Sequence, residues 1–295
     1  WNLADVQPVH GRSEADWIEE FDAIIDDAVR LRLRCDVPFG AFLSGGVDSS
    51  TVVGLMARHM TEPVKTFCIG FHDPRYDESG FAQAAADRFG TEHTMERVEP
   101  DMLDLWPMAT YHCDQPHGDV SFLPTYRVSE LAVRDVKVVL TGDGADELFA
   151  GYDKYKDFFA QPDIAALDDN TFQRRYFDSI SLFSAEGKRN LYGAEMRAGA
   201  GRLDSFDVAK PWFGAVPHQD RINQALFLDM QLLLSGNNLV KPDRMGMAVS
   251  LEARTPFLDY RMMEFAFRMP GDLKLRGGET KYIYKKAVAG LIGDD

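Results

Sequence analysis

The sequence has no apolar run that approaches the roughly 20 residues a helix needs to span a membrane. Its first residues, WNLADVQPVHGR, include neither an initiator methionine nor the apolar stretch of a secretory signal peptide. Cysteine is scarce, and Cys35, Cys68 and Cys113 form no CxxC pair, which is typical of reduced thiols in a cytoplasm. We therefore expect a cytoplasmic chain that has no membrane partner and is a piece of a longer protein.

Positive charge is also in short supply. The chain has 32 Lys and Arg against 47 Asp and Glu, a formal net charge of -15. Nucleic-acid surfaces need clustered Lys and Arg, so we expect no nucleic-acid partner. An acidic chain that binds a nucleotide must neutralise the phosphates locally, with a metal ion, helix termini and a few placed cations. The remaining composition, 45% hydrophobic in 295 residues, fits one large or two modest globular domains.

Hydrophobic periodicity predicts alternating helices and strands up to about Tyr152. Apolar residues recur at helical spacing from Ser13 to about Arg34, and a strand-like VPFGAFL is followed by a helix to about Met60. The alternation continues with a strand at VKTFCIGF, a helix from Asp77 to Phe89, a strand near His93 to Val98, helices from Pro100 to about Thr110 and from Phe122 to Val133, and a strand at VKVVL.

Apolar strands that alternate with helices indicate an α/β fold, in which helices cover both faces of a parallel sheet. After Tyr152 the pattern is mainly helical, most clearly from Arg221 to Leu234. We therefore predict an α/β core in residues 1–152 and a mainly helical part in residues 153–295 that packs beside the sheet.

The stretch SGGVDSS, residues 44–50, stands between a predicted strand and a predicted helix. A helix start leaves backbone N–H groups unsatisfied, and a glycine turn lets a polyanion such as phosphate approach them. A simple helix cap is the structural alternative, but it requires only one serine and one glycine. The stretch has no Lys of a Walker loop and lacks the three glycines of a dinucleotide fingerprint. Beside phosphates, the Asp48 carboxylate indicates a Mg²⁺ ligand, unless it only caps the helix.

A second polar stretch, TGDGADELFAGY, follows the predicted strand VKVVL. Ligands of parallel sheets bind at the carboxyl ends of the strands, where both this stretch and SGGVDSS fall. Asp143 and Asp146 of this stretch could also serve only as caps of the helix that follows.

These motifs resemble those of a known family. SGGVDSS is similar to the pyrophosphate loop of N-type ATP pyrophosphatases, which GMP, NAD and argininosuccinate synthetases also share. DVPFGAFLSGGVDSS, TGDGADELFAGY and DRMGMAVSLEARTPFLD, in this order, resemble the synthetase domain of the asparagine synthetase B family. The resemblance extends from Trp1 to the helix after Lys281 and implies the α/β fold of the adenine nucleotide alpha hydrolases.

The resemblance implies that residues 1–152 bind ATP and that the helical part completes the acceptor site. Ile69 would line the adenine pocket, with Thr141 and Gly142 nearby. The β- and γ-phosphates would be held by Ser44, Gly45, Gly46, Asp48, Ser49 and Ser50.

The resemblance also implies the catalytic and metal-binding residues. Asp48 and Asp146 would bind Mg²⁺, and Lys281 would contact the phosphates. Asp143 would lie near the reacting carboxylate and could accept a proton from ammonia, although Glu147 offers a second carboxylate for this role.

The implied activity is that of an ATP-dependent amide-forming ligase. A carboxylate, by default that of aspartate, attacks the α-phosphorus of ATP, pyrophosphate leaves, and ammonia then displaces AMP from the acyl-adenylate. The acceptor could instead be another carboxylate in a polysaccharide or secondary-metabolite pathway. A cyclising relative such as β-lactam synthetase typically has tyrosine at the position of Asp143, so Asp143 argues against that activity. The intact SGGVDSS and TGDGADE argue against a non-catalytic nucleotide-binding or scaffold module, since neither pattern is needed for folding.

Two further segments invite functional interpretations. In HCDQPH, residues 112–117, His112, Cys113, Asp114 and His117 resemble metal ligands, but no second ligand segment is visible, and we favour a segment that shapes the acceptor pocket. Here Gln115 replaces an acid that is usual in the family, which leaves the acceptor open.

In DRMGMAVSLEARTPFLD, residues 243–259, the charged side chains could organise the acceptor site through ion pairs. We expect structural roles for Asp243, Arg244 and Glu252, and we expect Arg254 to be the exception.

Family members usually begin with a glutaminase domain whose first residue is a nucleophilic cysteine. None of the cysteines here is terminal, so we expect that domain, which would supply ammonia, elsewhere in the full-length chain. We also expect a further lysine-bearing segment downstream of the last predicted helix. A homodimer is left open.

Overall fold

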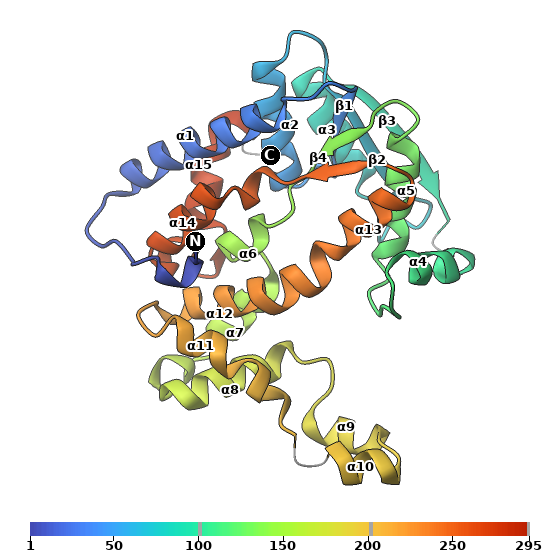
Figure 1. The fold of residues 1–295 in the computed structure, drawn as a ribbon. Coiled ribbons are helices and arrows are strands. Elements are labelled where there is room, and N and C mark those ends of the chain that lie inside the picture. Colours follow the sequence, from blue (N-terminus) through green and yellow to red (C-terminus); the bar gives the residue numbers. More distant parts are fainter. Residues whose placement is uncertain (100–101, 201–202, 294–295) are drawn as a thin grey trace.

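The computed structural model describes residues 1–99, 102–200 and 203–293. These residues form a five-stranded sheet in the order β3-β2-β1-β4-β5, in which every pairing is parallel (Figure 1). A separate two-stranded hairpin pairs β6, Leu275–Arg276, with β7, Glu279–Thr280. The parallel sheet comprises β1 Phe39–Phe42, β2 Lys65–Phe71, β3 Glu92–Val98, β4 Val138–Leu140 and β5 Glu252–Arg254.

The predicted α/β fold with a parallel sheet is confirmed, and four of the five strands fall where hydrophobic patterning predicted them. The fifth, β5, comes from the second half of the chain and was missed. Its three residues, EAR, are half-buried or exposed, so neither an apolar run nor an alternation marks them as a strand. Pairing of β5 with β4 is therefore decided by tertiary packing.

The helices of the first half also follow the predicted alternation. Ser13 and Asp16 form a capping box at the start of the first helix, which is the local signal that predicted it. Pro100, where we expected a helix to begin, lies outside the described residues. The helices are α1 Glu14–Arg32, α2 Val47–His59, α3 Ser79–Phe89, α4 Trp106–His112 and α5 Phe122–Ala132.

The second half is mainly helical. A π-helical segment, Met230–Asn238, continues directly from α12 and precedes α13. In Figure 1, α8 to α10 extend away from the sheet, with α9 and α10 at the far end. The helices are α6 Ala145–Phe149, α7 Asp153–Phe159, α8 Asp169–Ile180, α9 Ala185–Leu191, α10 Ala194–Ala200, α11 Lys210–Ala215, α12 Arg221–Asp229, α13 Val240–Ala248, α14 Tyr260–Arg268 and α15 Tyr282–Ile292.

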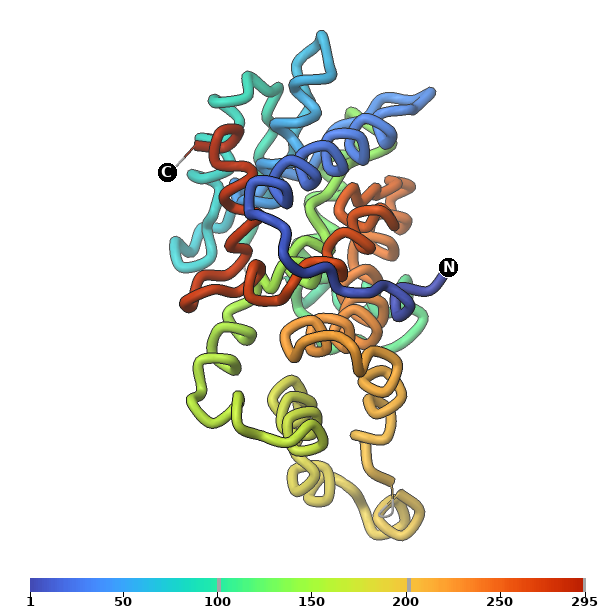
Figure 2. Tube along the Cα trace, turned by 90° about the vertical axis from the view of Figure 1, so that its left-hand side faces the viewer, coloured from blue at the N-terminus to red at the C-terminus, as the bar shows by residue number. Residues whose placement is uncertain are grey.

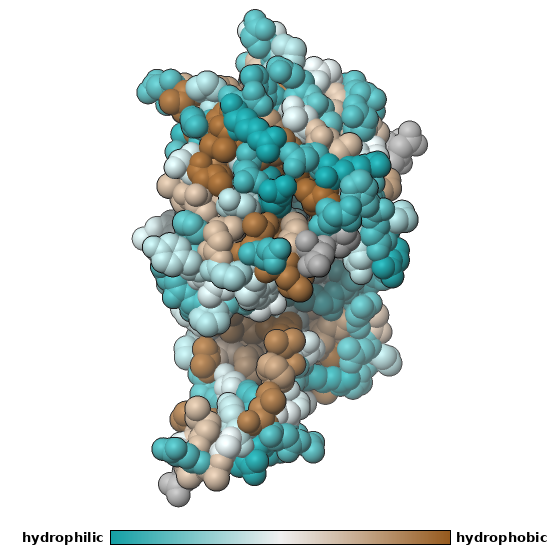
Figure 3. All heavy atoms as spheres, turned by 90° about the vertical axis from the view of Figure 1, so that its right-hand side faces the viewer, coloured by the Kyte–Doolittle hydropathy of each residue, from teal (hydrophilic) through white to brown (hydrophobic). Residues whose placement is uncertain are grey.

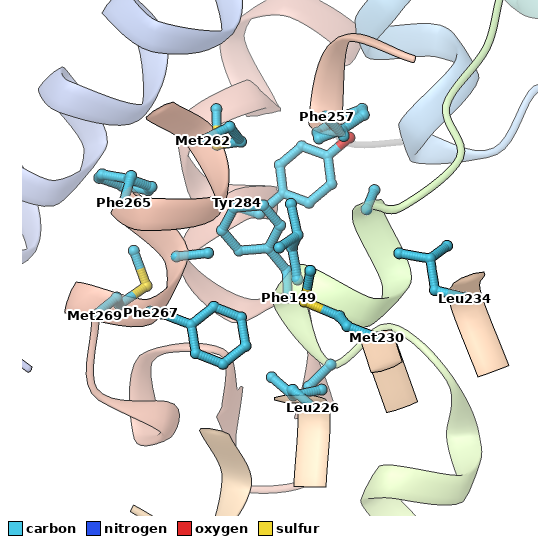
Figure 4. Close-up of a cluster of buried hydrophobic side chains, with 14 of the residues drawn as sticks. Phe149, Leu226, Met230, Leu234, Phe257, Met262, Phe265, Phe267, Met269 and Tyr284 are labelled. Atoms are coloured by element: carbon cyan, nitrogen blue, oxygen red, sulfur yellow. The ribbon is translucent and has the colours of Figure 1, made fainter. Parts of the chain in front are cut away.

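A core of aromatic rings ties the beginning of the chain to its end. Phe21 of α1 packs against Phe149 of α6 and Tyr284 of α15, with ring centroids 5.5 and 5.1 Å apart. Figure 4 shows Phe149 and Tyr284 beside Phe257 and Phe265 in one buried cluster. Figure 2 also shows this arrangement: the last helix, α15, lies beside the first, α1. This core fixes α6 and α15, whose first residues border the site described below.

The surface differs between the two ends of the molecule. Figure 3 shows mostly hydrophilic residues over the upper part of one face and hydrophobic patches around the hollow below it and on the lower lobe. Leu182, Leu191 and Leu203, near α9 and α10, are strongly exposed. Among the described helices, none combines the length and apolar character required to cross a bilayer.

Candidate active site

The turn between β1 and α2 depends on glycine and leaves the start of α2 without a side-chain cap. Gly45 has a φ of 82°, and a Cβ added there would lie 2.3 Å from the carbonyl carbon of Phe81, so only glycine fits. Gly46 is the N-cap of α2 and has no side-chain cap. Instead, the Gly46 N–H donates to Ser44 Oγ at 3.3 Å, and the Ser44 N–H donates to Ser49 Oγ at 3.2 Å. The serines thus organise the turn from within.

This loop borders a cavity of about 260 Å³ at the carboxyl ends of β1 and β4. The position is the one expected for a ligand site in a parallel sheet. Of the residues predicted from sequence, the lining includes Ser44, Asp48, Ser49, Thr141, Gly142, Asp143 and Asp146. It also includes Phe42, Gly144, Glu147, Tyr152, Asn238 and Lys241.

Other residues singled out from the sequence lie outside the lining. Ser50 is buried in the first turn of α2, where its N–H donates to the Gly46 carbonyl at 3.0 Å. Ile69, on β2, packs against a small apolar cluster that includes Phe67 and Val139. Gly45, Gly46 and Lys281 are also outside the lining, although Lys281 contacts two of its carboxylates.

Lys281 joins the two polar stretches that the sequence analysis identified. Its Nζ lies 2.7 Å from Asp48 Oδ2 and 2.6 Å from Asp146 Oδ1. Asp48 stands in the first turn of α2, and Asp146 in the first turn of α6. Lys281 precedes α15 in the left-handed conformation, with a φ of 54°, and its N–H donates to the Phe149 carbonyl at 3.1 Å. The core that fixes α6 and α15 therefore also sets the position of this ammonium group.

Gly151 makes the approach of these side chains possible. A Cβ at this position would lie 1.9 Å from Asp146 Oδ1 and 2.2 Å from Lys281 Cε. Any larger residue would displace one partner of the ion pair. This requirement was not predicted from the sequence, although Gly151 belongs to the stretch TGDGADELFAGY and a glycine there was the available signal.

Burial raises the pKa of Asp48 to about 6, and repulsion from Asp146 adds to the effect, whereas Lys281 opposes it. Burial alone would lower the pKa of Lys281, but attraction to Asp48 and Asp146 outweighs it, so the pKa is raised and the ammonium stays protonated. Two ionised carboxylates and one ammonium carry a net negative charge. The cluster can therefore accept a further cation.

The donor set fits Mg²⁺ that is shared with a nucleotide. Within residues 1–99, 102–200 and 203–293, no group of three or more His, Cys, Asp or Glu side chains is arranged to hold a metal ion. Mg²⁺ at nucleotide sites takes only one or two carboxylates and completes its octahedron with phosphates and water. Asp48 and Asp146, which meet at Lys281 beside the cavity, supply two such carboxylates.

The HCDQPH segment has structural partners. Cys113 is buried in an apolar cluster that includes Phe122. Asp114 forms an ion pair with Arg244 at 3.1 Å, and the His117 ring packs on Phe122 with centroids 3.9 Å apart. These contacts hold the segment against α5 and α13.

Two further carboxyl groups line the cavity, the half-buried Asp143 and the buried Glu147. Asp143 Oδ2 accepts a hydrogen bond from Thr141 Oγ1 at 2.7 Å. Glu147 Oε1 accepts from the Tyr152 hydroxyl at 2.8 Å and from Asn238 Nδ2 at 2.6 Å. Burial raises the pKa of both carboxyl groups above their ordinary values. Either group can therefore take up a proton more readily than an exposed carboxylate.

The helical half contributes lining residues that the sequence analysis missed. Asn238 ends the π-helical segment, and Lys241 stands in the first turn of α13. π-helical turns often mark functional sites, but a backbone of this kind has no sequence signature.

The charged residues of DRMGMAVSLEARTPFLD are paired as expected. Arg254 Nε lies 2.7 Å from Glu252, and Arg244 lies 3.6 Å from Asp243. Arg254, expected to be the exception, also has a structural position, because its Nη1 donates to the carbonyls of Arg32 and Arg34, each at 2.9 Å. It binds the end of α1 to β5 and does not line the cavity.

Comparison with known proteins agrees with these features. The family model described as Asparagine synthase matches residues 20–295. The chain is 30% identical to asparagine synthetase (glutamine-hydrolyzing) 1 of Bacillus subtilis over 317 residues, covering 98% of this chain and 49% of the relative. It is 28% identical to asparagine synthetase (glutamine-hydrolyzing) 3 of Bacillus subtilis over 311 residues, covering 100% and 49%. It is 26% identical to amidase chyE of Penicillium rubens over 351 residues, covering 96% and 51%.

The chain thus spans about half the length of the curated relatives it matches. The family model, in contrast, matches the chain almost from end to end and includes every residue of the cavity lining. The chain therefore belongs to the asparagine synthase family.

Proposed function

We propose that this chain is the synthetase part of an ATP-dependent amide-forming ligase. A carboxylate oxygen of the acceptor attacks the α-phosphorus of ATP, and the bond to the bridging oxygen breaks to release pyrophosphate. The nitrogen of ammonia then attacks the acyl carbon, AMP leaves with the bonding electrons, and the ammonia nitrogen loses a proton to give the amide. Membership of the family and the presence of both motif loops at one cavity support this activity.

The phosphate groups would bind at the turn before α2, where the backbone N–H groups of the helix start are available. Ser44, Gly45 and Gly46 form this turn, and Ser49 and Ser50 follow at the start of α2. Lys281 would stabilise negative charge on the departing pyrophosphate. Mg²⁺ bound by Asp48 and Asp146 would neutralise further charge there when present. We assign the adenine pocket to the region of Ile69, Thr141 and Gly142.

We propose Asp143 as the acceptor of the proton that ammonia loses. Burial raises its pKa above the ordinary value, which makes its carboxylate a better proton acceptor than an exposed one. Its carboxylate is oriented by Thr141. Glu147 is already engaged by Tyr152 and Asn238, which favours a role in shaping the pocket.

The finer assignments follow the family. We propose aspartate as the default acceptor, residues 1–152 as the nucleotide-binding part and residues 153–295 as the part that completes the acceptor site. The relatives from Bacillus subtilis are named glutamine-hydrolyzing, so we propose that a glutaminase domain of the full-length protein supplies ammonia. We further propose that the protein acts in the cytoplasm.

One observation carries the proposal. Lys281 meets Asp48 and Asp146, so that three distant segments converge beside the cavity at the strand ends. Folding alone does not call for a buried lysine flanked by two partly buried carboxylates with surplus negative charge, because desolvating charges is costly. A site that binds Mg²⁺ and polyphosphate requires it.

The test is ATP–pyrophosphate exchange with Mg²⁺, measured in the full-length protein with aspartate and a panel of other carboxylic acids. We expect exchange that depends on one acid and is lost in Lys281→Met. Lys156→Met, which removes an exposed lysine of α7, is the charge-matched control and should retain exchange. Circular dichroism of both variants checks folding. An absence of exchange with every acid, in a folded protein that binds Mg-ATP, would refute the proposal.

A further inference from the structure

The loop between α4 and α5 places Asp119 beside the cavity wall. Asp119 Oδ2 accepts hydrogen bonds from Lys241 Nζ at 3.0 Å and from Asn237 Nδ2 at 3.1 Å. Its Oδ1 accepts from the backbone N–H and the hydroxyl of Ser121, at 2.9 and 2.6 Å. The loop, the π-helical segment and α13 thus hold one carboxylate in a single position.

The Asp119 carboxylate holds the Lys241 ammonium group in place but does not use all of its hydrogen-bond donors. Burial alone would raise the pKa of Asp119, but the hydrogen bonds from Ser121 and the ion pair with Lys241 outweigh it and hold that pKa well below its ordinary value. The pair therefore persists across the physiological pH range. An ammonium group has three N–H donors, and within the described part of the chain Asp119 is the bonded acceptor of Lys241. The remaining donors are available to a ligand.

The charges around the cavity make Lys241 distinctive. The Lys281 ammonium lies outside the lining and is engaged by two carboxylates. Among the described residues of the lining, Lys241 is the one that carries positive charge. The lining also carries the carboxyl groups of Asp48, Asp143, Asp146 and Glu147.

A negatively charged group of an acceptor would be repelled from most of this cavity. The reacting carboxylate meets the nucleotide and its metal, but a second anionic group needs a cation of its own. Lys241 is contributed by α13, whereas the phosphate loop is contributed by β1 and α2, so the two positions belong to different walls. The lysine is therefore suited to the distal end of the acceptor.

We propose that Lys241, positioned by Asp119, binds a second anionic group of the acceptor, and that the enzyme thereby selects carboxylic acids with another negative charge, such as dicarboxylates. This inference rests on the proposed function and names the determinant of its substrate class. It also assigns a role to the loop that contains HCDQPH, because Asp119 follows that segment and orients the lysine.

The test compares acids that differ by one carboxylate in ATP–pyrophosphate exchange by the full-length protein. Aspartate and β-alanine, succinate and propionate, and glutarate and butyrate form such pairs. We expect the dicarboxylate of a productive pair to be preferred. Lys241→Met should raise its KM roughly 10- to 100-fold, as for loss of a hydrogen bond to a charged group, with little change in the KM for ATP.

Variants of Lys241 and Asp119 distinguish a role in binding the acceptor from a purely structural role. Lys241→Arg should restore part of the preference, and Asp119→Asn should raise the KM of the dicarboxylate more than it lowers kcat, because it frees the lysine. The exposed Lys156→Met is the charge-matched control. The inference is overturned if exchange is retained but monocarboxylates are preferred, or if Lys241→Met raises the KM for ATP instead. Loss of exchange with all acids in the unaltered protein would refute the proposed function itself.

Discussion

At the residue scale, the site depends on a position that has no side chain. Gly151 lies against Asp146 Oδ1 and Lys281 Cε, so the ion pair closes over its Cα. Both neighbours are side-chain groups, but Asp146 is held by Lys281, and Lys281 is held by both Asp146 and Asp48. A side chain at position 151 would therefore force Asp146 and Lys281 apart, and the proposed function depends on their ion pair.

Gly151→Ala should reduce ATP–pyrophosphate exchange at least 10-fold and destabilise the protein by about 1–3 kcal/mol, because the added methyl overpacks the cluster. Urea unfolding and exchange rates measure the two effects. Gly214→Ala in α11 is the control, since a Cβ there meets no atom within 4 Å. That variant should be neutral or slightly more stable. If Gly151→Ala behaved like the control, the proposed requirement for glycine would be wrong.

We expect the Asp48 carboxylate to lower the free energy of unfolding, although the proposed function requires it. Its folded-state pKa of about 6 exceeds the ordinary value of 3.8, so the unfolded chain releases its proton first as the pH rises. Stability is therefore lost between about pH 4 and pH 6, by up to about 3 kcal/mol. Asp48→Asn removes this cost, and Lys281 keeps Asp146 as a partner.

We expect Asp48→Asn to abolish exchange and yet to be more stable than the unaltered protein at pH 8, with the difference vanishing near pH 4. Urea unfolding at both pH values checks the sign. The exposed Asp157→Asn should change stability by less than about 0.5 kcal/mol. A variant that is less stable at pH 8 would show that the Lys281 ion pair outweighs burial.

At the scale of elements, Asp259 joins two helices. Its side chain caps α14 by accepting from the Arg261 N–H at 3.0 Å. It also accepts from Arg32 Nη1, near the end of α1, at 3.0 Å, and from the Arg261 guanidinium. Burial would raise the pKa of Asp259, but these bonds, first those from Arg261, outweigh it and lower the pKa to about 2. The last residue of the motif DRMGMAVSLEARTPFLD therefore has a structural role.

A lowered pKa contributes stability that is present above the unfolded value of 3.8 and is lost as the pH falls through about 2. Asp259→Asn should therefore lower the free energy of unfolding by roughly 2 kcal/mol at pH 7. The difference should shrink steadily below pH 4. Denaturant unfolding at pH 7 and pH 3 measures it, and a difference that is equal at both would contradict the electrostatic explanation.

At the scale of the whole molecule, Asp229 holds the helical half together. This fully buried carboxylate at the end of α12 accepts from the hydroxyls of Tyr155 and Tyr176, each at 2.7 Å, and lies 2.7 Å from Lys154 Nζ. Burial, together with the charge of Asp229, raises the pKa of both tyrosines well above the ordinary value. Helices α7, α8 and α12 therefore meet at one oxygen.

Asp229→Ala should destabilise the protein by about 3–5 kcal/mol, because it leaves a lysine and two hydroxyls without their acceptor. Hydrogen exchange should quicken in α7 and α8 more than in the sheet, since the contact lies in the helical half. Tyr176→Phe removes one hydrogen bond and should cost only about 1 kcal/mol. Uniform acceleration across the sheet and the helical half would contradict a local role.

The sequence predicted the features that depend on neighbouring residues. The capping box at Ser13 and Asp16 signals α1, and SGGVDSS signals its own turn because glycine and helix-start geometry are local properties. Strands β1, β2 and β4 were predicted from apolar runs because the strands inside a parallel sheet are buried on both faces, whereas the edge strand β3 is largely exposed.

Only the tertiary structure decided which distant residues meet. Lys281 and Asp48 are 233 positions apart, and Lys241 and Asp119 are 122 apart. Such contacts are set by the packing of α15 on the core and of α13 on α5, and no local period encodes them. The resemblance to a family proposed a role for Lys281, whereas Gly151 and Lys241 were missed, because a small residue or a single lysine acquires significance only from the groups that surround it in the folded chain.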